Sequence, residues 1–467
     1  MKHTLSPRVA AVLAATLLTL GCASRLTAAE RPPNVVFILA DDLGWTDLGC
    51  QGSKFYKTPN IDRLADHGLR FTAGYTCGPN CQPTRAALMS GQYGPRTGVY
   101  TVGSIDRFDW KSRPLRPVDN VTKLNPKVVT VAESLKAAGY KTGHFGKWHL
   151  GDDPEHHPLA QGFDESVVSM GQHFDFATRP KVEVPKGAYL ADWLTDKSVD
   201  FITRHKGGPF LLCLHHFGVH SPYQAKPDLI AKFKDTPRAG GHHNPTYAAM
   251  IASVDESVGR VLKTLDDLGL SENTLVVFTS DNGGVGGYAR EGIVRKKDDT
   301  TDNAPLRMGK GSLYEGGVRV AYIFQWTGTV RPGTVTDEPI NSVDLYPTLL
   351  ELAGAKPPAG QPLDGVSYLP TLRGQKRERG PLYWHFPGYL GQGKDNWRTL
   401  PVGSVRDGDW KLLEFFEDDR QELYNLKDDV GEKTNLAAKM PEKVKELHGK
   451  LTAWREQVGA KMPTKNK

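Results

Sequence analysis

The feature that most constrains the fold of this chain is a series of short apolar runs separated by helical patterns. Continuous runs such as NVVFILA and TLVVFT are expected of strands covered on both faces, because a half-exposed strand alternates apolar and polar residues. We expect strands at residues 34–40, 141–145, 209–215, 274–279 and 318–324, and helices at residues 58–68, 128–138 and 247–268. This alternation predicts an α/β fold with a large, mostly parallel central sheet flanked by helices.

The pattern changes after about Gly374. Residues 404–416 and 421–426 have the pattern of antiparallel strands, and residues 441–458 have that of a closing helix. A chain of 467 residues is also longer than the roughly 250–300 residues over which a single core grows. We therefore predict a main domain at residues 30–374 and a C-terminal subdomain at residues 375–467, with a small antiparallel sheet and a closing helix.

The N-terminus has the order of a secretory signal peptide. Basic residues precede an apolar run at residues 9–20, and small residues follow up to Ala29. The run is shorter than the ~20 apolar residues of a membrane-spanning helix, and no other stretch approaches that length. We predict a signal peptide at residues 1–29, export to the periplasm or the medium, and no transmembrane segment. The triplet LGC leaves one alternative, a lipoprotein anchored at Cys22.

Charge and cysteine content exclude several classes of protein. The 59 basic and 53 acidic side chains are spread along the whole chain, and no dense basic block indicates nucleic acid as a partner. Five cysteines in this length exclude a disulfide scaffold. Whether Cys50, Cys77 and Cys213 form any disulfide is left open.

Acidic pairs follow two of the predicted strands. Asp41 and Asp42 come after the first strand, and Asp281 and Asn282 come after the fourth. In open α/β sheets, ligands bind beyond the carboxyl ends of the strands. Three carboxylates and an amide oxygen suit a hard cation such as calcium or magnesium. The alternative is that both pairs only cap turns.

The segment CQPTR, which begins at Cys81, is the sharpest local signal. Pro83 suits the first turn of a helix that continues to Gly91. Cys81 then lies at the helix N-terminus, where the backbone dipole favours negative charge. Arg85 follows one turn later on the same face. A structural cysteine, paired with Cys77, is the alternative interpretation.

The whole pattern resembles the type I sulfatases of the alkaline-phosphatase-like superfamily, and among them the bacterial arylsulfatases. Their signature is C-x-P-x-R followed by a short helix that ends in glycine, and here it reads CQPTRAALMSG. Thr84 stands where the family more often has serine or alanine. The motifs NVVFILADDLGW, TPNIDRLADHGLRF, GHFGKWHLG, HSPY, FTSDNGG and GKGSLYEGGVRV arrive in family order from about residue 34 to 320.

The resemblance implies a nucleophile and a metal. Cys81 matches the cysteine that a formylglycine-generating maturation enzyme oxidises to Cα-formylglycine. One calcium ion, with magnesium less expected, would be held by Asp41, Asp42, Asp281, Asn282 and the oxygen of residue 81. Arg85 and Lys147 would hold the formylglycine oxygens.

The remaining roles that the resemblance implies concern proton transfer and substrate. His149 would remove the proton that triggers sulfate release. His220 and Lys310 would bind the sulfate and protonate the departing alcohol. Gln172 and His173 lie in a region that often faces substrate in the family, so we include them as substrate-binding candidates.

The sugar or aryl group must be recognised by loops outside the motifs. The expected loops are residues 103–125, 161–186, 283–308 and 381–402. Their cationic and aromatic side chains suit a sulfated carbohydrate; they are Arg107, Trp110, Arg113, Arg116, Arg290, Arg295, Lys296, Lys297, Trp384, His385 and Trp397.

Two rival functions share the scaffold. One is a phosphodiester or phosphonate monoester hydrolase, and the other is an inert glycan-binding homologue in which Cys81 stays unmodified. Among other residues, we interpret Glu315 as structural and expect His215 and His216 to cap a strand rather than bind zinc. We expect four further histidines to be solvated in polar loops: His156, His157, His242 and His243.

Overall fold

The computed structural model describes residues 31–293, 300–391 and 397–467. Residues 33–467 form one compact unit. The predicted signal peptide and Cys22 lie outside the described residues, and the domain boundary at residue 374 stays a prediction. In the described part of the chain, no helix is both long and apolar enough to cross a bilayer.

A nine-stranded sheet forms the centre of the molecule. Its strands are β1 (Asn34–Ala40), β2 (Leu69–Tyr75), β4 (Lys141–Gly146), β5 (Glu165–Val168), β6 (Phe210–His215), β7 (Thr274–Ser280), β8 (Arg319–Gln325), β9 (Thr334–Thr336) and β10 (Ile340–Asn341). The order is β10-β2-β8-β7-β1-β6-β4-β5, with β9 also paired to β2. Only β8 runs antiparallel to its neighbours, so the predicted mostly parallel sheet is confirmed.

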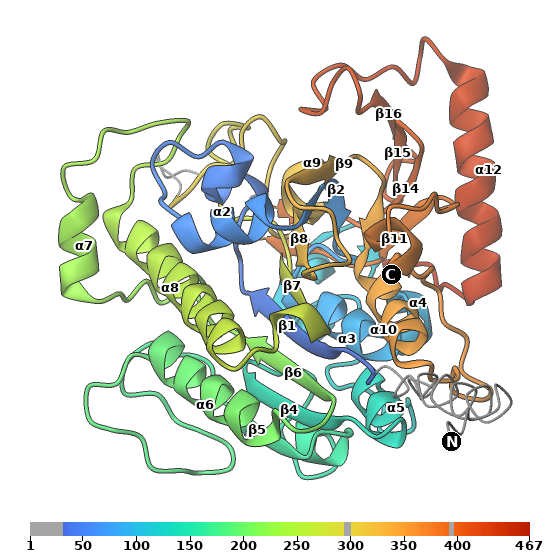
Figure 1. The fold of residues 1–467 in the computed structure, drawn as a ribbon. Coiled ribbons are helices and arrows are strands. Elements are labelled where there is room, and N and C mark those ends of the chain that lie inside the picture. Colours follow the sequence, from blue (N-terminus) through green and yellow to red (C-terminus); the bar gives the residue numbers. More distant parts are fainter. Residues whose placement is uncertain (1–30, 294–299, 392–396) are drawn as a thin grey trace, which may run out of the picture. The chain divides into compact units, whose positions relative to one another are not determined.

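Helices cover both faces of this sheet (Figure 1). They are α2 (Pro59–Asp66), α3 (Cys81–Ser90), α4 (Gly94–Thr97), α5 (Val131–Ala137), α6 (Leu190–His205), α7 (Pro227–Phe233), α8 (Pro245–Asp267), α9 (Glu315–Val318), α10 (Leu345–Ala353) and α11 (Leu369–Leu372). Alternate side chains of β1 enter two cores. Val36 and Ile38 pack with residues of α2, α6 and α8, whereas Val35 and Phe37 pack with residues of α3, α5 and α10. Burial on both faces explains the unbroken apolar run of β1.

The C-terminal part forms a second, antiparallel sheet with a helix against it, as predicted. Strands β11 (Leu382–Phe386), β14 (Val402–Asp407), β15 (Trp410–Phe415) and β16 (Gln421–Asn425) pair in that order. Leu447, Leu451 and Trp454 of α12 (Pro441–Val458) pack in one cluster with Val405 and Leu412. Two short pairs complete the fold: β3 (Leu115–Arg116) with β17 (Thr464–Lys465), and β12 (Leu390–Gly391) with β13 (Trp397–Thr399).

Some boundaries differ from the predicted ones for local reasons. Thr58 is the N-cap of α2, so the helix begins at Pro59, and the Asn60 amide donates to Asp255 at 2.8 Å. Helix α5 begins at Val131 because Thr130 forms a capping box with Glu133. Strand β2 and helices α6 and α10 have no counterpart among the predicted elements.

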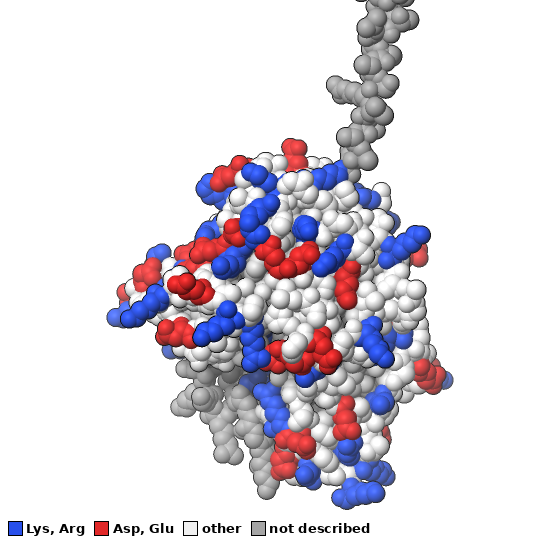
Figure 2. Space-filling view, turned by 90° about the horizontal axis from the view of Figure 1, so that it is seen from below, with Lys and Arg blue, Asp and Glu red and all other residues white. Residues whose placement is uncertain are grey.

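Charges of both signs are interspersed on the surface. On the face that Figure 2 shows, lysine and arginine side chains alternate with aspartate and glutamate, and neither sign forms a continuous patch. This face therefore offers no extended basic surface of the kind that binds nucleic acid.

A buried charged cluster joins the two sheets. The Lys411 ammonium is fully buried and lies 2.8 Å from Glu315 and 2.9 Å from Glu432. Tyr75 donates to the second oxygen of Glu315 at 2.7 Å, and Arg319 lies 3.2 Å from it. Burial alone would raise the pKa of Glu315, but Lys411 and Arg319 outweigh it and lower that pKa. Glu315 is therefore a structural residue, as its sequence context indicated.

Loss of the central cation of this cluster should be costly. Lys411→Met keeps the buried stem but leaves two carboxylates without their shared partner, so we expect a loss of about 3–5 kcal/mol in the free energy of unfolding. Urea denaturation followed by fluorescence measures it. Lys427→Met, at an exposed position of the same subdomain, should change stability by less than about 0.5 kcal/mol. A loss of under about 1 kcal/mol for Lys411→Met would mean that the cluster is not a stabilising link.

Candidate functional site

The sheet topology brings the sequence-predicted residues to one edge. Strands β1, β6, β4 and β7 run parallel, so the segments after them meet at their carboxyl ends. These segments carry Asp41, His220, Lys147 and Asp281 in turn. Strand β8 runs the opposite way, which brings Lys310, upstream of it, to the same edge. Strand β2 is also antiparallel to β8 and delivers α3, with Cys81 as its first residue, to this edge.

Three carboxylates and one amide gather there in full burial. Asn282 Nδ2 donates to Asp42 Oδ1 at 2.9 Å, and the backbone N–H of Asp42 donates to Asp281 Oδ1 at 3.3 Å. Asp42 has a φ of 64°, a backbone conformation that non-glycine residues rarely adopt and that is often found at functional sites. The acidic pairs predicted from the ends of two separate strands are thus one cluster.

The donor set fits a hard divalent cation. Asp41 Oδ1 and Asn282 Oδ1 are buried and have no hydrogen-bond partner in the described part of the chain, which is a costly state for polar atoms. Burial, together with the charge of Asp41, raises the pKa of Asp281 to about 6. A divalent cation would be coordinated by these two oxygens, and its charge would offset the repulsion between the carboxylates.

Cys81 lies against this cluster and against His149. Its Sγ is 3.4 Å from His149 Nδ1, and Asp41, Cys81 and Asp281 each offer a ligand atom within 4.8 Å of the others. Burial raises the pKa of the Cys81 thiol, although Lys147 acts in the opposite direction. Burial and the charges of Lys147 and Arg85 hold the pKa of His149 well below its usual range. His149 is therefore neutral near pH 7.

Three cations complete the site, of which Arg85 and Lys147 are buried and Lys310 is partly buried. Arg85 donates to Asp281 Oδ2 at 2.9 Å and to the Lys147 carbonyl at 2.5 Å. The Lys147 ammonium lies 2.6 Å from Asp41, and that of Lys310 lies 2.5 Å from an Asp42 oxygen. Burial would lower the pKa of Lys147 and of Lys310, but these carboxylates raise it in both. All three cations stay charged in a region of low dielectric.

His220 faces the cluster from a more open position. Its Nδ1 donates to the Ser221 carbonyl at 2.6 Å, which leaves Nε2 turned toward Asp42 at 3.7 Å. His173 is buried, and its Nε2 donates to the His220 carbonyl at 2.8 Å. His173 therefore lies behind His220 and positions it, whereas Gln172 is exposed beside it.

Within the described residues, His215 and His216 do not come together around one site, and three other histidines were wrongly expected in solvent. His215 contacts His144 at 3.2 Å and His216 contacts Ser257 at 3.0 Å, so their rings turn to different partners. His156, His157 and His242 are at most 9% exposed. His242, for example, stacks on Tyr56 and hydrogen-bonds the Asp302 carbonyl at 2.8 Å, contacts that a polar local sequence does not reveal.

Several side chains of the loops expected to recognise the substrate are buried or paired with other residues. Trp384 is buried and donates to the Thr76 carbonyl at 2.7 Å, and His385 is also buried, so the substrate role expected for both is wrong. Their position on the paired strand β11 explains this burial. Arg113 pairs with Glu417. Arg295, Lys296 and Lys297 lie outside the described residues.

Two residues that no motif singled out hold the site's backbone. The Asn303 amide nitrogen donates to the carbonyls of Gly284, Gly286 and Met308 at 2.9–3.0 Å. The Tyr288 hydroxyl donates to the Lys310 carbonyl at 2.7 Å. Their residue types are ordinary in loops, so only these contacts reveal their role.

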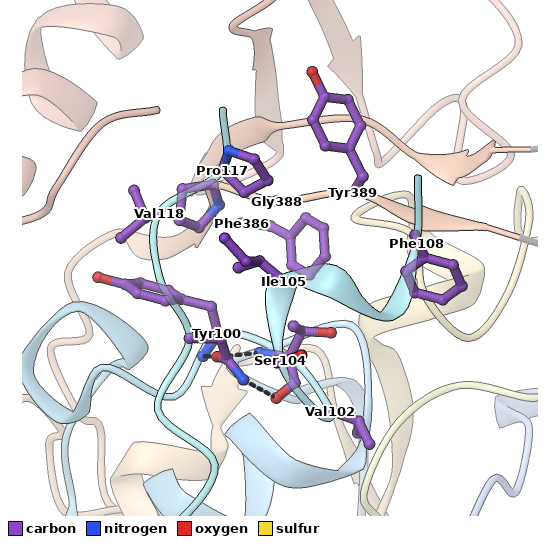
Figure 3. A pocket seen from close by; sticks show the side chains of 13 residues that line it. Tyr100, Val102, Ser104, Ile105, Phe108, Pro117, Val118, Phe386, Gly388 and Tyr389 are labelled. Atoms are coloured by element: carbon purple, nitrogen blue, oxygen red, sulfur yellow. Dashed lines mark hydrogen bonds between the residues drawn. The ribbon is translucent and has the colours of Figure 1, made fainter. Parts of the chain in front are cut away.

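A pocket lies between residues 100–120 and residues 386–389 (Figure 3). Phe108, Phe386 and Tyr389 are among its lining side chains, and none of the lining residues is charged. It therefore lacks the groups that would recognise a sulfate or carboxylate.

Comparison with known proteins agrees with this geometry. The family model "Sulfatase" matches residues 33–355, and the model "N-sulphoglucosamine sulphohydrolase, C-terminal" matches residues 308–457. A sulfatase of Formosa agariphila is 37% identical, over 91% of this chain and 89% of that protein. The N-acetylgalactosamine-6-sulfatase of Mus musculus is 35% identical, over 79% of this chain and 72% of that protein.

Solved structures agree as well. The crystal structure of Ps i-CgsB in complex with k-i-k-neocarrahexaose has a TM-score of 0.76 at 30% identity, and the match covers 91% of this chain and 93% of that one. The fold and the resemblance inferred from the motifs are thus confirmed. Since the sulfatase model spans most of the chain and these relatives align with nearly all of the fold, the chain belongs to the sulfatase family and is a sulfuric ester hydrolase.

Proposed function

We propose that this chain hydrolyses sulfate esters of carbohydrates, using a Cα-formylglycine made from Cys81 and one calcium ion. The observation that carries the proposal is the position of residue 81, with Sγ 3.4 Å from His149 and within 4.8 Å of oxygens of Asp41 and Asp281. An unmodified thiol is a poor nucleophile there, because burial raises its pKa.

The modification solves a problem of turnover. A hydrated aldehyde at position 81 supplies two hydroxyls on one carbon, one to displace the alcohol from sulfur and one to expel the sulfate afterwards. Arg85 and Lys147 would orient the two hydroxyls. Calcium held by Asp41, Asp42, Asp281 and Asn282 would lower the pKa of the attacking oxygen and offset charge on the sulfate.

Three side chains would bind the sulfate and carry out the two proton transfers. Lys310 would bind the sulfate oxygens, since fixed positive charge stabilises the negative charge that develops in the transition state. His220, in its imidazolium form with both ring nitrogens protonated, would donate its Nε2 proton to the departing alcohol. His149, neutral because burial and Lys147 lower its pKa, would accept the proton whose loss releases the sulfate.

Sequence and relatives support the substrate class and the cellular location. One relative is named an N-acetylgalactosamine-6-sulfatase, and one related crystal structure holds k-i-k-neocarrahexaose. We propose export through the signal peptide at residues 1–29, with Cys81 oxidised by a formylglycine-generating enzyme of the producing cell. N-terminal sequencing of the exported protein distinguishes cleavage near Ala29 from a lipidated Cys22.

A substrate panel tests the function. The protein is expressed together with a formylglycine-generating enzyme, peptide masses report the state of residue 81, and ion chromatography measures sulfate released from sulfated mono- and disaccharides and aryl sulfates. We expect an aldehyde at residue 81 and sulfate release from at least one saccharide. A persistent thiol with glycan binding but no turnover would favour the inert homologue. Faster cleavage of phosphonate monoesters or phosphodiesters would favour the other rival.

The role of His220 can be tested by the choice of leaving group. A sugar hydroxyl needs a proton to depart, whereas nitrophenolate leaves without one, and general-acid assistance is worth about 10²–10⁴-fold. His220→Ala should therefore reduce turnover of a sugar sulfate far more than turnover of nitrophenyl sulfate. His149→Ala should slow both substrates and let a covalent sulfate accumulate on residue 81, which intact mass detects. Equal losses on the two substrates for His220→Ala would contradict the general-acid role.

A further inference from the structure

Arg398, on the short strand β13, projects away from the apolar pocket of Figure 3. Successive side chains of a strand point to opposite faces. Trp397 packs beside Phe108 and Tyr389, with ring centroids 6.3 and 5.3 Å apart. The Arg398 guanidinium instead lies over the ring of Tyr288, 4.9 Å from its centroid. The two neighbours therefore face different surroundings.

Arg398 is next to the lysine that we assign to sulfate binding. Tyr288, on which its guanidinium stacks, donates to the backbone carbonyls of Gly309 and Lys310 at 2.9 and 2.7 Å. Gly311 follows directly, with a φ of 100°, and a Cβ built there would lie 3.5 Å from Arg398 Cδ. The aliphatic stem of Arg398 is thus against the backbone that carries Lys310.

The charge of Arg398 also acts on Tyr223. Burial raises the pKa of the Tyr223 phenol, and the charges of Asp42, Lys310 and Arg398 all act on it. Tyr223 belongs to the segment that carries His220. Tyr223 thus lies within electrostatic reach of both Arg398 and Lys310.

The guanidinium is also without a neutralising partner in the described residues. Arg113, Arg116 and Arg290 each pair with a carboxylate. No carboxylate of the described ranges pairs with Arg398, and its Nε is buried without a hydrogen-bond partner there. A partly buried, unpaired guanidinium is a strong site for an oxyanion, because its fork donates two hydrogen bonds at once.

We propose that Arg398 binds a second anionic group of the substrate, a further sulfate or a carboxylate, while Lys310 binds the sulfate that is cleaved. This inference rests on the proposed function. It makes Arg398 a specificity-determining residue that favours sugars bearing two negative groups over sugars bearing one.

Matched substrates test it. A monosulfated disaccharide, the same disaccharide with a second sulfate, and one with a uronate carboxylate are compared, with nitrophenyl sulfate as a small singly charged substrate. Arg398→Ala should lower kcat/KM for at least one doubly charged substrate by about 10- to 100-fold, mainly through KM, since hydrogen bonds to charged groups are strong. For singly charged substrates we expect a loss of at most about threefold. A loss on the disulfated substrate identifies the second group as a sulfate. A loss on the substrate with a uronate identifies it as a carboxylate.

Control variants distinguish a role of Arg398 in binding the second anionic group from a role in the fold or in positioning Lys310. Arg398→Lys should retain part of the preference, because it keeps the charge without the fork. Arg331→Ala, which removes an exposed arginine, should change neither substrate class. Added salt should raise KM for the doubly charged substrate more in the wild type than in Arg398→Ala.

Equal losses on singly and doubly charged substrates would overturn the inference, since Arg398 would then act only through Tyr288 on the position of Lys310. An unchanged preference in Arg398→Ala would overturn it as well. If the wild type released sulfate from none of the substrates, the proposed function itself would fail, and this inference with it.

Discussion

Cys81→Ser should stop after a single turnover. A serine at this position can attack sulfur and release the alcohol, but it has no second hydroxyl on the same carbon to expel the sulfate. With nitrophenyl sulfate we expect a burst of about one nitrophenol per enzyme, followed by a steady rate at least about a hundredfold below that of the wild type. Intact mass should show sulfate retained on the protein, and peptide masses should locate it on residue 81.

Two further variants serve as controls for this result. Cys81→Ala should give neither burst nor turnover while keeping the circular dichroism spectrum and unfolding temperature of the wild type. Cys50→Ser, which changes a partly buried cysteine beside α2, should keep both the aldehyde at residue 81 and the activity. Activity of Cys81→Ala above about a hundredth of wild type would remove residue 81 from the reaction.

Removal of the metal should abolish activity, and calcium should restore it better than zinc. The ligands that we assign from the protein, apart from residue 81, are carboxylate and amide oxygens, which calcium prefers. Calcium should also protect the fold, by about 2.7 kcal/mol when present at about 100 times its Kd. Thermal unfolding and calorimetry measure this binding without reference to turnover.

Asp281→Asn should mimic the chelated enzyme. It keeps the volume of the side chain but removes a charge from the cluster, so calcium affinity should fall by at least about 10- to 100-fold. Asp228→Asn, at an exposed position on α7, is the matched control and should bind calcium as the wild type does. Recovery with zinc but not with calcium would contradict the oxygen cage and point to His220 as a ligand.

Much of the site was predictable because its residues follow elements with strong local signals. Strand β1 is buried on both faces, so its unbroken apolar sequence predicted both the strand and the place where Asp41 and Asp42 begin. The proline after Cys81 and the glycine at residue 91 predicted the helix that starts there. These signals depend on burial and helix geometry, which short stretches of sequence record directly.

Other positions could not be read from the sequence. His242 occupies a segment rich in polar and loop-forming residues, whereas Trp384 lies in the short apolar run LYWHF. Packing against distant elements buries both side chains. The substrate role expected of Trp384 and the solvent exposure expected of His242 were wrong for that reason. Strand β2 was missed because its two faces are buried to different degrees, which breaks the apolar run.

The sequence by itself determined the fold class, the family and the identity of the residues at the site. The tertiary structure decided how these residues are paired: Lys147 with Asp41, Lys310 with Asp42, His173 behind His220, and Arg398 over Tyr288 with no carboxylate partner among the described residues. The physical reason is that local signals arise from interactions among neighbours in the chain. Charge pairing instead depends on distances between residues far apart in sequence, which the reversed direction of β8 and the position of β13 set.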